Sequence, residues 1–146
     1  MTMLNESQVR TIMRTKLQKL SNLPNISWEN RPFLPPDVTT DVGPVVLWIQ
    51  EHQRTLDETQ SAIGMIQTIG ETLYSVYTPK GRGTKEADDL SKSIAESFEP
   101  TQSLTGINET IVIEHTERHP YRVDPDLPAW VFKTVSIRWR AFNPTS

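Results

Sequence analysis

Apolar residues recur at steps of three and four in two segments of the chain, and this spacing predicts two amphipathic helices. The first begins at a cap provided by Asn5 or Ser7 and ends before Pro24, because proline disfavours helical backbone at the residue before it. The second is capped by Thr84, has acidic residues in its first turns and ends before Pro100. The two apolar stripes are Val9, Ile12, Met13, Leu17 and Leu20, then Ala87, Leu90, Ile94, Ala95 and Phe98.

Segments of alternating, β-branched or aromatic residues predict the strands. We expect a short strand at residues 26–29, a core strand at 45–49 that continues toward Arg54, and an aromatic strand at 72–78. Later strands are expected at 110–114 and at 129–142, and residues 117–123 form either a further strand or a loop. In the last strand, the alternation places Val135, Ile137 and Trp139 on one side. The four tryptophans, Trp28, Trp48, Trp130 and Trp139, all fall on predicted strands and are interpreted as core or interface residues.

The ambiguous segment 55–70, rich in Gln, Thr and Gly, lies directly before the aromatic strand and is interpreted as the far end of a long β-hairpin. Runs of sequential strands favour antiparallel pairing. The predicted fold class is therefore α+β: a mostly antiparallel sheet with two helices packed on it and a long β-hairpin arm. The length of 146 residues predicts a single domain spanning 1–146.

Charge and cysteine content exclude several classes of protein. Fifteen basic residues stand against 18 acidic ones, and the isoelectric point is about 5.6, which argues against a strongly basic nucleic-acid binder. The absence of cysteine excludes disulfides, cysteine-ligated zinc and thiol catalysis. No signal peptide and no membrane-spanning run is visible, so composition predicts a soluble, intracellular protein.

Three groups of residues could carry chemistry, and each has a plainer interpretation. The loop Lys80–Lys85 has the glycines and basic residues of a phosphate site, but its spacing matches no phosphate-binding motif, and a turn leading into a capped helix is favoured. His115, Glu117 and His119 could hold zinc, whereas a solvated edge strand explains them equally simply. Asp124 and Asp126 fall short of a calcium loop. We therefore assign no catalytic, cofactor-binding or metal-ligating residue, and no cofactor, and we expect no enzyme activity.

One extended segment carries a family resemblance. Residues 26–36 read I-x-W-x-N-x-x-F-x-P-P, through Ile26, Trp28, Asn30, Phe33, Pro35 and Pro36. This segment, followed by a strand, resembles the opening of a family of small phage tail terminator and tail-completion proteins. The preceding helix, the long hairpin, the glycine turn at Gly81 and Gly83, and the closing residues 137–141 follow in the same order, so the resemblance spans about residues 9–142.

The resemblance implies a structural virion protein of a tailed bacteriophage, similar to the tail terminator of phage lambda. Such proteins form a homohexameric ring that caps the head-proximal end of the tail tube, stops its polymerisation and offers an attachment surface to the neck. The implied partners are further copies of the chain, the tail tube protein and the head–neck connector protein. Genomic DNA passes through the lumen without sequence-specific binding, and no membrane is involved. The implied location is the virion tail or neck, and the host cytoplasm during assembly.

Two alternatives remain open. One is a neck or head–tail joining subunit of the same virion, and the other is a small metal- or phosphate-binding enzyme that uses His115, His119 or the Lys80–Lys85 loop. For the ring-forming protein, we also expect the arm at residues 55–69 to be mobile in the isolated subunit and ordered in the assembly.

Overall fold

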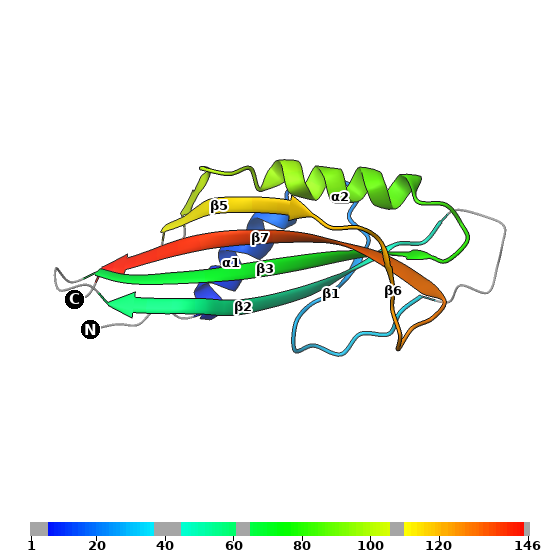
Figure 1. The fold of residues 1–146 in the computed structure, drawn as a ribbon, viewed down its shortest axis with the longest axis horizontal. Coiled ribbons are helices and arrows are strands. Elements are labelled where there is room, and N and C mark those ends of the chain that lie inside the picture. The colour runs from blue at the N-terminus through cyan, green and yellow to red at the C-terminus, as the bar shows by residue number, and fades with distance from the viewer. Residues whose placement is uncertain (1–5, 37–44, 61–64, 106–109, 145–146) are drawn as a thin grey trace.

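In the described parts of the chain, seven strands form one twisted sheet, which carries two helices. The structure is a computed structural model that describes residues 6–36, 45–60, 65–105 and 110–144. Within these residues the strand order is β1-β2-β3-β7-β5-β4, and β6 pairs with β7 (Figure 1). The strands are β1 (Asn25–Ser27), β2 (Trp48–Gln60), β3 (Met65–Pro79), β4 (Ser103–Thr105), β5 (Thr110–Arg118), β6 (Arg122–Val123) and β7 (Trp130–Pro144). All pairings are antiparallel except that of β1 with β2, and the predicted α+β class is confirmed.

Three long strands, β2, β3 and β7, form the centre of the sheet. β3 pairs with β7 along its whole length, from Met65 opposite Pro144 to Pro79 opposite Trp130. On its other side β3 pairs with β2 as a hairpin that contains a bulge between Thr55 and Asp57. The predicted hairpin is therefore confirmed for its described parts, while residues 61–64 at its far end lie outside the described residues.

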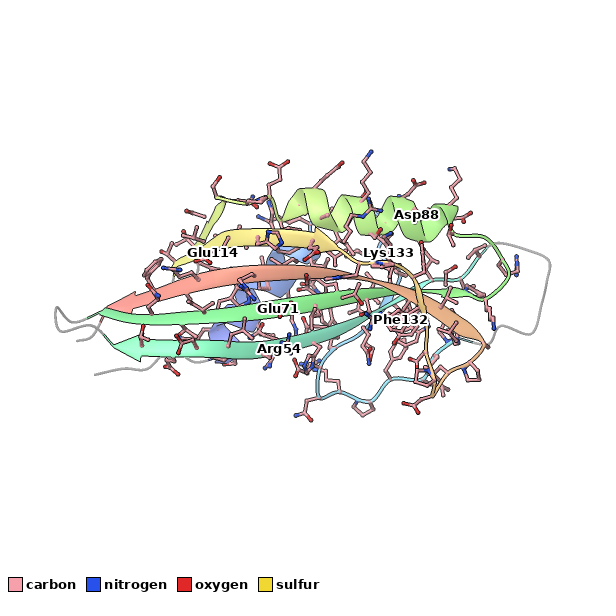
Figure 2. The ribbon with its side chains drawn as sticks, in the orientation of Figure 1. Arg54, Glu71, Asp88, Glu114, Phe132 and Lys133 are labelled. Atoms are coloured by element: carbon pink, nitrogen blue, oxygen red, sulfur yellow. The ribbon has the colours of Figure 1, made fainter. Side chains whose placement is uncertain are left out.

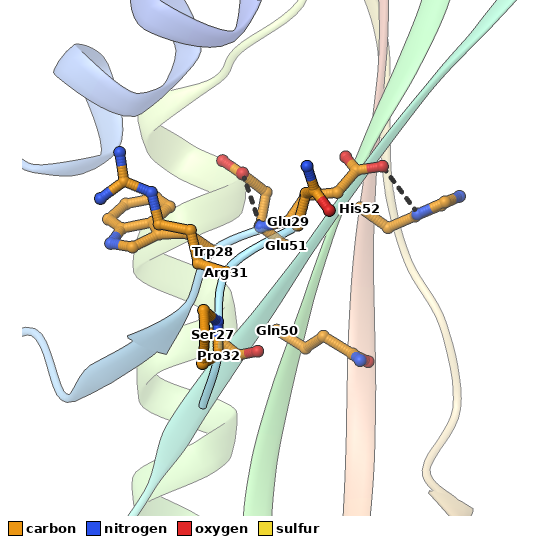
Figure 3. Close-up of a pocket in the computed structure, with 9 residues that line it drawn as sticks. Ser27, Trp28, Glu29, Arg31, Pro32, Gln50, Glu51 and His52 are labelled. Carbon is orange, nitrogen blue, oxygen red and sulfur yellow. Dashed lines mark hydrogen bonds and ion pairs between the residues drawn. The ribbon is translucent and has the colours of Figure 1, made fainter. Parts of the chain in front are cut away.

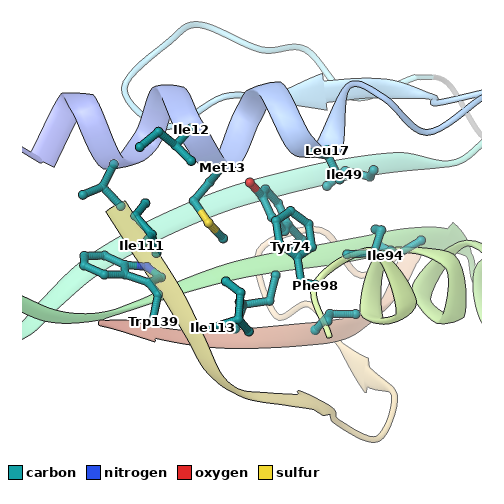
Figure 4. Packing of buried hydrophobic residues seen from close by; sticks show 14 of the residues in the cluster. Ile12, Met13, Leu17, Ile49, Tyr74, Ile94, Phe98, Ile111, Ile113 and Trp139 are labelled. Atoms are coloured by element: carbon teal, nitrogen blue, oxygen red, sulfur yellow. The ribbon is translucent and has the colours of Figure 1, made fainter. Parts of the chain in front are cut away.

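Both helices cover the same face of the sheet, which we call the inner face. The apolar side of α1 (Glu6–Leu17) and that of α2 (Lys85–Ser97) pack against inward-pointing strand residues (Figure 4). Fully buried members of this core include Val9, Met13, Leu17, Ile49, Tyr74, Ile94, Phe98, Ile111, Ile113, Ile137 and Trp139. The apolar stripes of the two helices face this core, as their steps of three and four predict. The inward side of the last strand is the one that the alternation predicts, because burial of one side fixes the register of a strand.

The opposite, outer face of the sheet carries a second, smaller aromatic cluster. Trp48, Tyr77 and Trp130 are buried there, with Phe33, Leu127 and Phe132 packed against them. Neighbouring residues Trp48 and Ile49 are thus both buried, but on opposite faces. This agrees with the expected two-sided burial of the core strand.

Several expected boundaries are wrong. The first helix ends at Leu17, well before Pro24, because tight i to i+3 hydrogen bonds close its last turn and Asn22 then turns the chain at φ 59°. The strand expected at 45–49 begins only at Trp48, and Val46 is 44% exposed. Its pairing with β3 begins only where Trp48 meets Tyr77, so residues 45–47 have no ladder to join.

Three smaller differences concern the first, fourth and sixth strands. β1 ends at Ser27, so Trp28 follows a strand instead of lying on one. β4 was not predicted, since three residues carry no periodic signal. Segment 117–123 was expected to be either a strand or a loop, and it contains parts of two strands. β5 continues to Arg118, and β6 pairs separately with β7.

Candidate interaction surfaces

The aromatic cluster on the outer face is held by two loops that fold over one end of the sheet. Trp48 stacks on Tyr77 with ring centroids 3.9 Å apart and meets Trp130 edge-on at 5.9 Å. Phe33, from the proline-rich segment after β1, lies 5.1 Å from Trp48. Leu127 contributes from the loop before β7. Aromatic contacts of this kind bury large apolar areas, so the cluster fixes both loops to the sheet.

Asp124 fastens the second loop. Its Oδ2 accepts a 2.8 Å hydrogen bond from the Tyr77 hydroxyl, and its Oδ1 accepts one of 2.9 Å from the backbone N–H of Asp126. Burial, and then the hydrogen bond to Asp124, raise the pKa of Tyr77 above its usual range. Both oxygens of Asp124 therefore serve the turn, and the candidate calcium pair is explained as a turn with a side-chain cap.

The remainder of the outer face is a ladder of charged and polar side chains. Arg54 on β2 lies 2.8 Å from Glu71 on β3, and Arg138 on β7 is directly opposite Glu71 (Figure 2). Farther along, Arg140 pairs with Glu114. Both helices lie on the inner face, so neither helix covers this ladder. Exposed ion pairs contribute little to stability, which leaves their charges available to a partner surface.

A polar pocket of about 760 Å³ opens beside β1 and the edge of β2 (Figure 3). Its lining residues are Ser27, Trp28, Glu29, Asn30, Arg31, Pro32, Gln50, Glu51 and His52. The Glu51 carboxylate in this lining is almost fully buried, and the single Nε–H of Arg14 on α1 is shared between its two oxygens at 3.0 Å. Arg14 Nη2 also donates to Glu51 Oε1, at 2.5 Å. The Glu29 backbone N–H also donates to Glu51 Oε1, at 3.4 Å.

The two carboxylates of this pocket are bound by neighbouring side chains and backbone amides. The hydrogen bond to Glu51 raises the pKa of Arg14, whose guanidinium also lies 4.8 Å above the Trp28 ring. The second carboxylate, Glu29, takes hydrogen bonds from Arg10 at 3.5 Å and from the Gln53 backbone N–H at 2.8 Å. These contacts connect three elements: α1, β2 and the segment that follows β1. We call the group of Arg14, Glu29 and Glu51 the lock, because its ion pairs and hydrogen bonds hold these elements together.

The candidate metal residues do not converge. His115 lies 3.5 Å from Glu117, but it is opposite Arg138, whose positive charge opposes cation binding. His119 lies beyond β5, and its Nε2 is 2.9 Å from Ser136 Oγ. Across the described parts of the chain, no group of three His, Cys, Asp or Glu residues is placed to hold a metal ion.

The Lys80–Lys85 loop is a turn that leads into α2, as the favoured interpretation has it. Gly81 and Gly83 adopt φ of 82° and 85°, a region that glycine enters readily. Thr84 precedes the helix, but its hydroxyl caps no backbone N–H and lies 3.4 Å from Asp88 instead. Asp88 also accepts a 2.7 Å hydrogen bond from Tyr121. The helix's own acidic residues thus occupy its first turn, which disfavours a bound phosphate there.

Comparisons with known proteins show a fold and no family. No family model and no curated protein matches this chain. Twenty-two chains of solved structures match. One of them is 13% identical, with a TM-score of 0.65 over 99% of this chain and 98% of its own length. At this identity the likeness establishes a shared α+β architecture only. In the described part of the chain, neither helix is long and apolar enough to cross a membrane.

Sequence reasoning missed the lock around Glu51. One signal was present in the sequence. Ile49, Glu51 and Gln53 are at alternate positions, so they point to the same, inner side of the strand. A carboxylate on the inner side of a strand needs a buried partner. The pattern does not say that this partner is Arg14, since the contact joins residues 37 positions apart.

Proposed function

We propose that this chain is the tail terminator of a tailed bacteriophage: a subunit of a homohexameric ring that caps the head-proximal end of the tail tube, stops its polymerisation and presents an attachment surface to the neck. Its work is geometric. A repeated contact between unlike patches closes into a ring when its rotation closes, and otherwise gives a filament. The proposal assigns no chemical reaction to any residue.

The observation that carries the proposal is the inequality of the two faces of the sheet. The inner face is filled by two helices, while the outer face carries a charged ladder and an aromatic corner held by two loops. A terminator needs such inequality, since one of its sides must match the tube and the other must not extend it. An acidic chain also suits the wall of a channel for DNA, because basic walls would bind phosphate.

The family-like segment supports the proposal through its structural role. Ile26 packs against the main core, Trp28 lies under Arg14, and Phe33 packs on Trp48. Ile26, Trp28 and Phe33 thus anchor the chain as it passes from the inner side of the sheet to the outer side. Resemblance at these positions therefore concerns the geometry of the subunit and not a reaction.

Mass photometry and negative-stain microscopy of the full chain, with and without purified tail tubes, test the proposal. We expect hexamers and tubes capped at one end. An Arg138→Glu variant, which reverses a charge on the exposed ladder, is expected to lower capping at least tenfold. A Lys92→Glu variant, on the exposed side of α2, is the matched control and should cap normally.

The outcomes separate the alternatives. A chain that stays monomeric and never binds tubes contradicts the proposal. Binding to the portal-side connector without affinity for tubes favours the neck subunit. If the Arg138→Glu variant still caps tubes, the proposed ring stands, but its contact with the tube does not use the ladder.

A further inference from the structure

The rim of the aromatic corner exposes apolar side chains to solvent. Leu34 is 89% exposed, although the neighbouring Phe33 is packed on Trp48 at 5.1 Å. On the other side of the corner, Phe132 is only partly buried. Prolines on both sides of the Phe33–Leu34 pair restrict its backbone, so a partner that covers Leu34 orders little that is not already ordered. Apolar surface that adjoins aromatic residues is typical of the cores of protein interfaces.

Basic side chains predominate beside this rim. Exposed charged residues next to it are Arg31, Lys80, Arg122 and Asp126. Arg122 lies opposite Phe132 in the pairing of β6 with β7, and directly opposite residues share one face of a sheet. A further carboxylate, that of Asp124, is hydrogen-bonded within the corner. The rim is therefore apolar, with an excess of exposed positive charge.

The bulge of β2 carries an exposed apolar residue that has acidic neighbours. Leu56 is the extra residue of this bulge, and it is 41% exposed. The next two residues, Asp57 and Glu58, are exposed carboxylates. The nearby positive charge of Arg54 is paired with Glu71 at 2.8 Å. We call Leu56, Asp57 and Glu58 the bulge site, and its exposed charge is negative.

The rim and the bulge site lie toward opposite ends of the sheet (Figure 1). Leu56 is eight positions after Trp48 on β2, which corresponds to ~26 Å at ~3.3 Å per residue. One subunit therefore cannot join its own rim to its own bulge site. Contacts between two rims or between two bulge sites bring like charges together, which disfavours them. A rim against a bulge site joins apolar to apolar surface and basic to acidic groups, so charge selects the unlike pairing.

We propose that the rim of the aromatic corner is a docking surface for the bulge site of a second copy of this chain, with Leu34 against Leu56 and Arg122 beside Asp57. The contact joins unlike patches, so every associated pair keeps one free rim and one free bulge site. Repetition of such a contact gives a ring when its rotation closes. The inference deepens the proposed function and rests on it for the closed ring, whereas the contact itself requires only that copies associate head to tail.

Sedimentation equilibrium of the full chain, without tail tubes, tests the contact. Leu34→Asp places a charge on the rim, Leu56→Asp places one at the bulge site, and we expect each to move self-association to at least tenfold higher concentration. The matched control, Ser93→Asp on the exposed side of α2, introduces the same charge outside both sites and should leave the transition unchanged. Because both leucines are exposed, the circular dichroism of their variants should match that of the unmodified chain.

An equimolar mixture of the two leucine variants tests whether the patches are unlike. The intact bulge site of the Leu34→Asp variant can dock on the intact rim of the Leu56→Asp variant, so we expect a dimer that grows no further. Reversal of charge tests the polar part of the contact. Arg122→Glu should weaken association at least tenfold, and adding Asp57→Arg to the same chain should restore it.

The outcomes separate this contact from the proposed function. A chain that stays monomeric, association that ignores both leucine variants, or a mixture that forms no dimer overturns the contact. If the variants and the mixture behave as expected but the unmodified chain caps no tubes, the contact stands and the tail terminator function is contradicted. If hexamers cap tubes and Leu34→Asp changes neither, the function stands and this docking surface is overturned.

Discussion

Among the glycines of the described residues, Gly70 has the surroundings that are least tolerant of one added methyl group. It lies on the inner face of β3, directly opposite Trp139 on β7. A Cβ at residue 70 would come within 2.3 Å of Trp139 Cζ2 and 2.9 Å of the Arg54 backbone oxygen. The indole of Trp139, itself fully buried, therefore occupies the space that a side chain at residue 70 would need.

The cost of Gly70→Ala follows from these distances. Ordinary contact begins at 3.4 Å, so the indole has to retreat by about 1.1 Å (3.4 minus 2.3), and the backbone oxygen cannot escape by changing rotamer. Overpacking of this kind costs ~1–3 kcal/mol, and the gain from replacing glycine in a strand is ~0.5–1 kcal/mol. Because the clash involves a backbone oxygen as well as the indole, the upper end of the first range applies, and we expect a net loss of about 2 kcal/mol (about 3 minus about 1), or a fall of roughly 4–8 °C in Tm.

Urea unfolding followed by tryptophan fluorescence and circular dichroism measures this loss. A double-mutant cycle with Trp139→Phe isolates the clash, because the smaller ring vacates the space. Trp139→Phe alone loses the 3.0 Å hydrogen bond from the indole N–H to Thr72, but it should recover at least about 1 kcal/mol of the Gly70→Ala loss in the double variant. Strict additivity, or a Gly70→Ala variant as stable as the unmodified chain, would refute the packing argument.

Two further predictions concern buried polar groups. Glu51→Ala strands the Arg14 charge and should lower the free energy of unfolding by about 3 kcal/mol in urea titrations, and a loss under about 1 kcal/mol would contradict the lock. Tyr77, whose pKa is raised above 10.0, stays protonated in the folded state while it ionises in the unfolded state, so stability should fall as pH rises from 9 to 11. Tyr77→Phe should make that slope less steep without abolishing it, because Tyr74 and Tyr121 also have raised pKa values, and an unchanged slope would contradict the assignment.

The periodic parts of the fold were predictable because burial imposes their period. The stripe from Val9 to Leu17 and the alternation from Val135 to Trp139 both face the main core, as expected. The ends of the helices and strands were less predictable, because they depend on partners elsewhere in the chain. Val46 belongs to an apolar run but is exposed, since the ladder begins only where Trp48 meets Tyr77.

The surfaces were far less predictable than the elements. His115 and His119 share a segment, yet their neighbours in space are Arg138 and Ser136 on β7, which no local pattern reveals. The aromatic corner was visible only as separate aromatic residues on predicted strands and in a proline-rich segment. Its assembly depends on the strand register, which a sequence pattern does not specify between non-adjacent strands.

The two carboxylates of the lock, Glu29 and Glu51, depend on one another. Glu29 donates its backbone N–H to Glu51 at 3.4 Å, while its side chain accepts the hydrogen bond from Gln53. Glu51 in turn is held by Arg14 of α1. Removing Glu51 therefore frees the backbone that positions Glu29, so faster hydrogen exchange at the Gln53 amide should accompany the loss of stability. A Glu51→Gln variant, which keeps an acceptor for that backbone N–H, should lose stability while the Gln53 amide stays protected from hydrogen exchange.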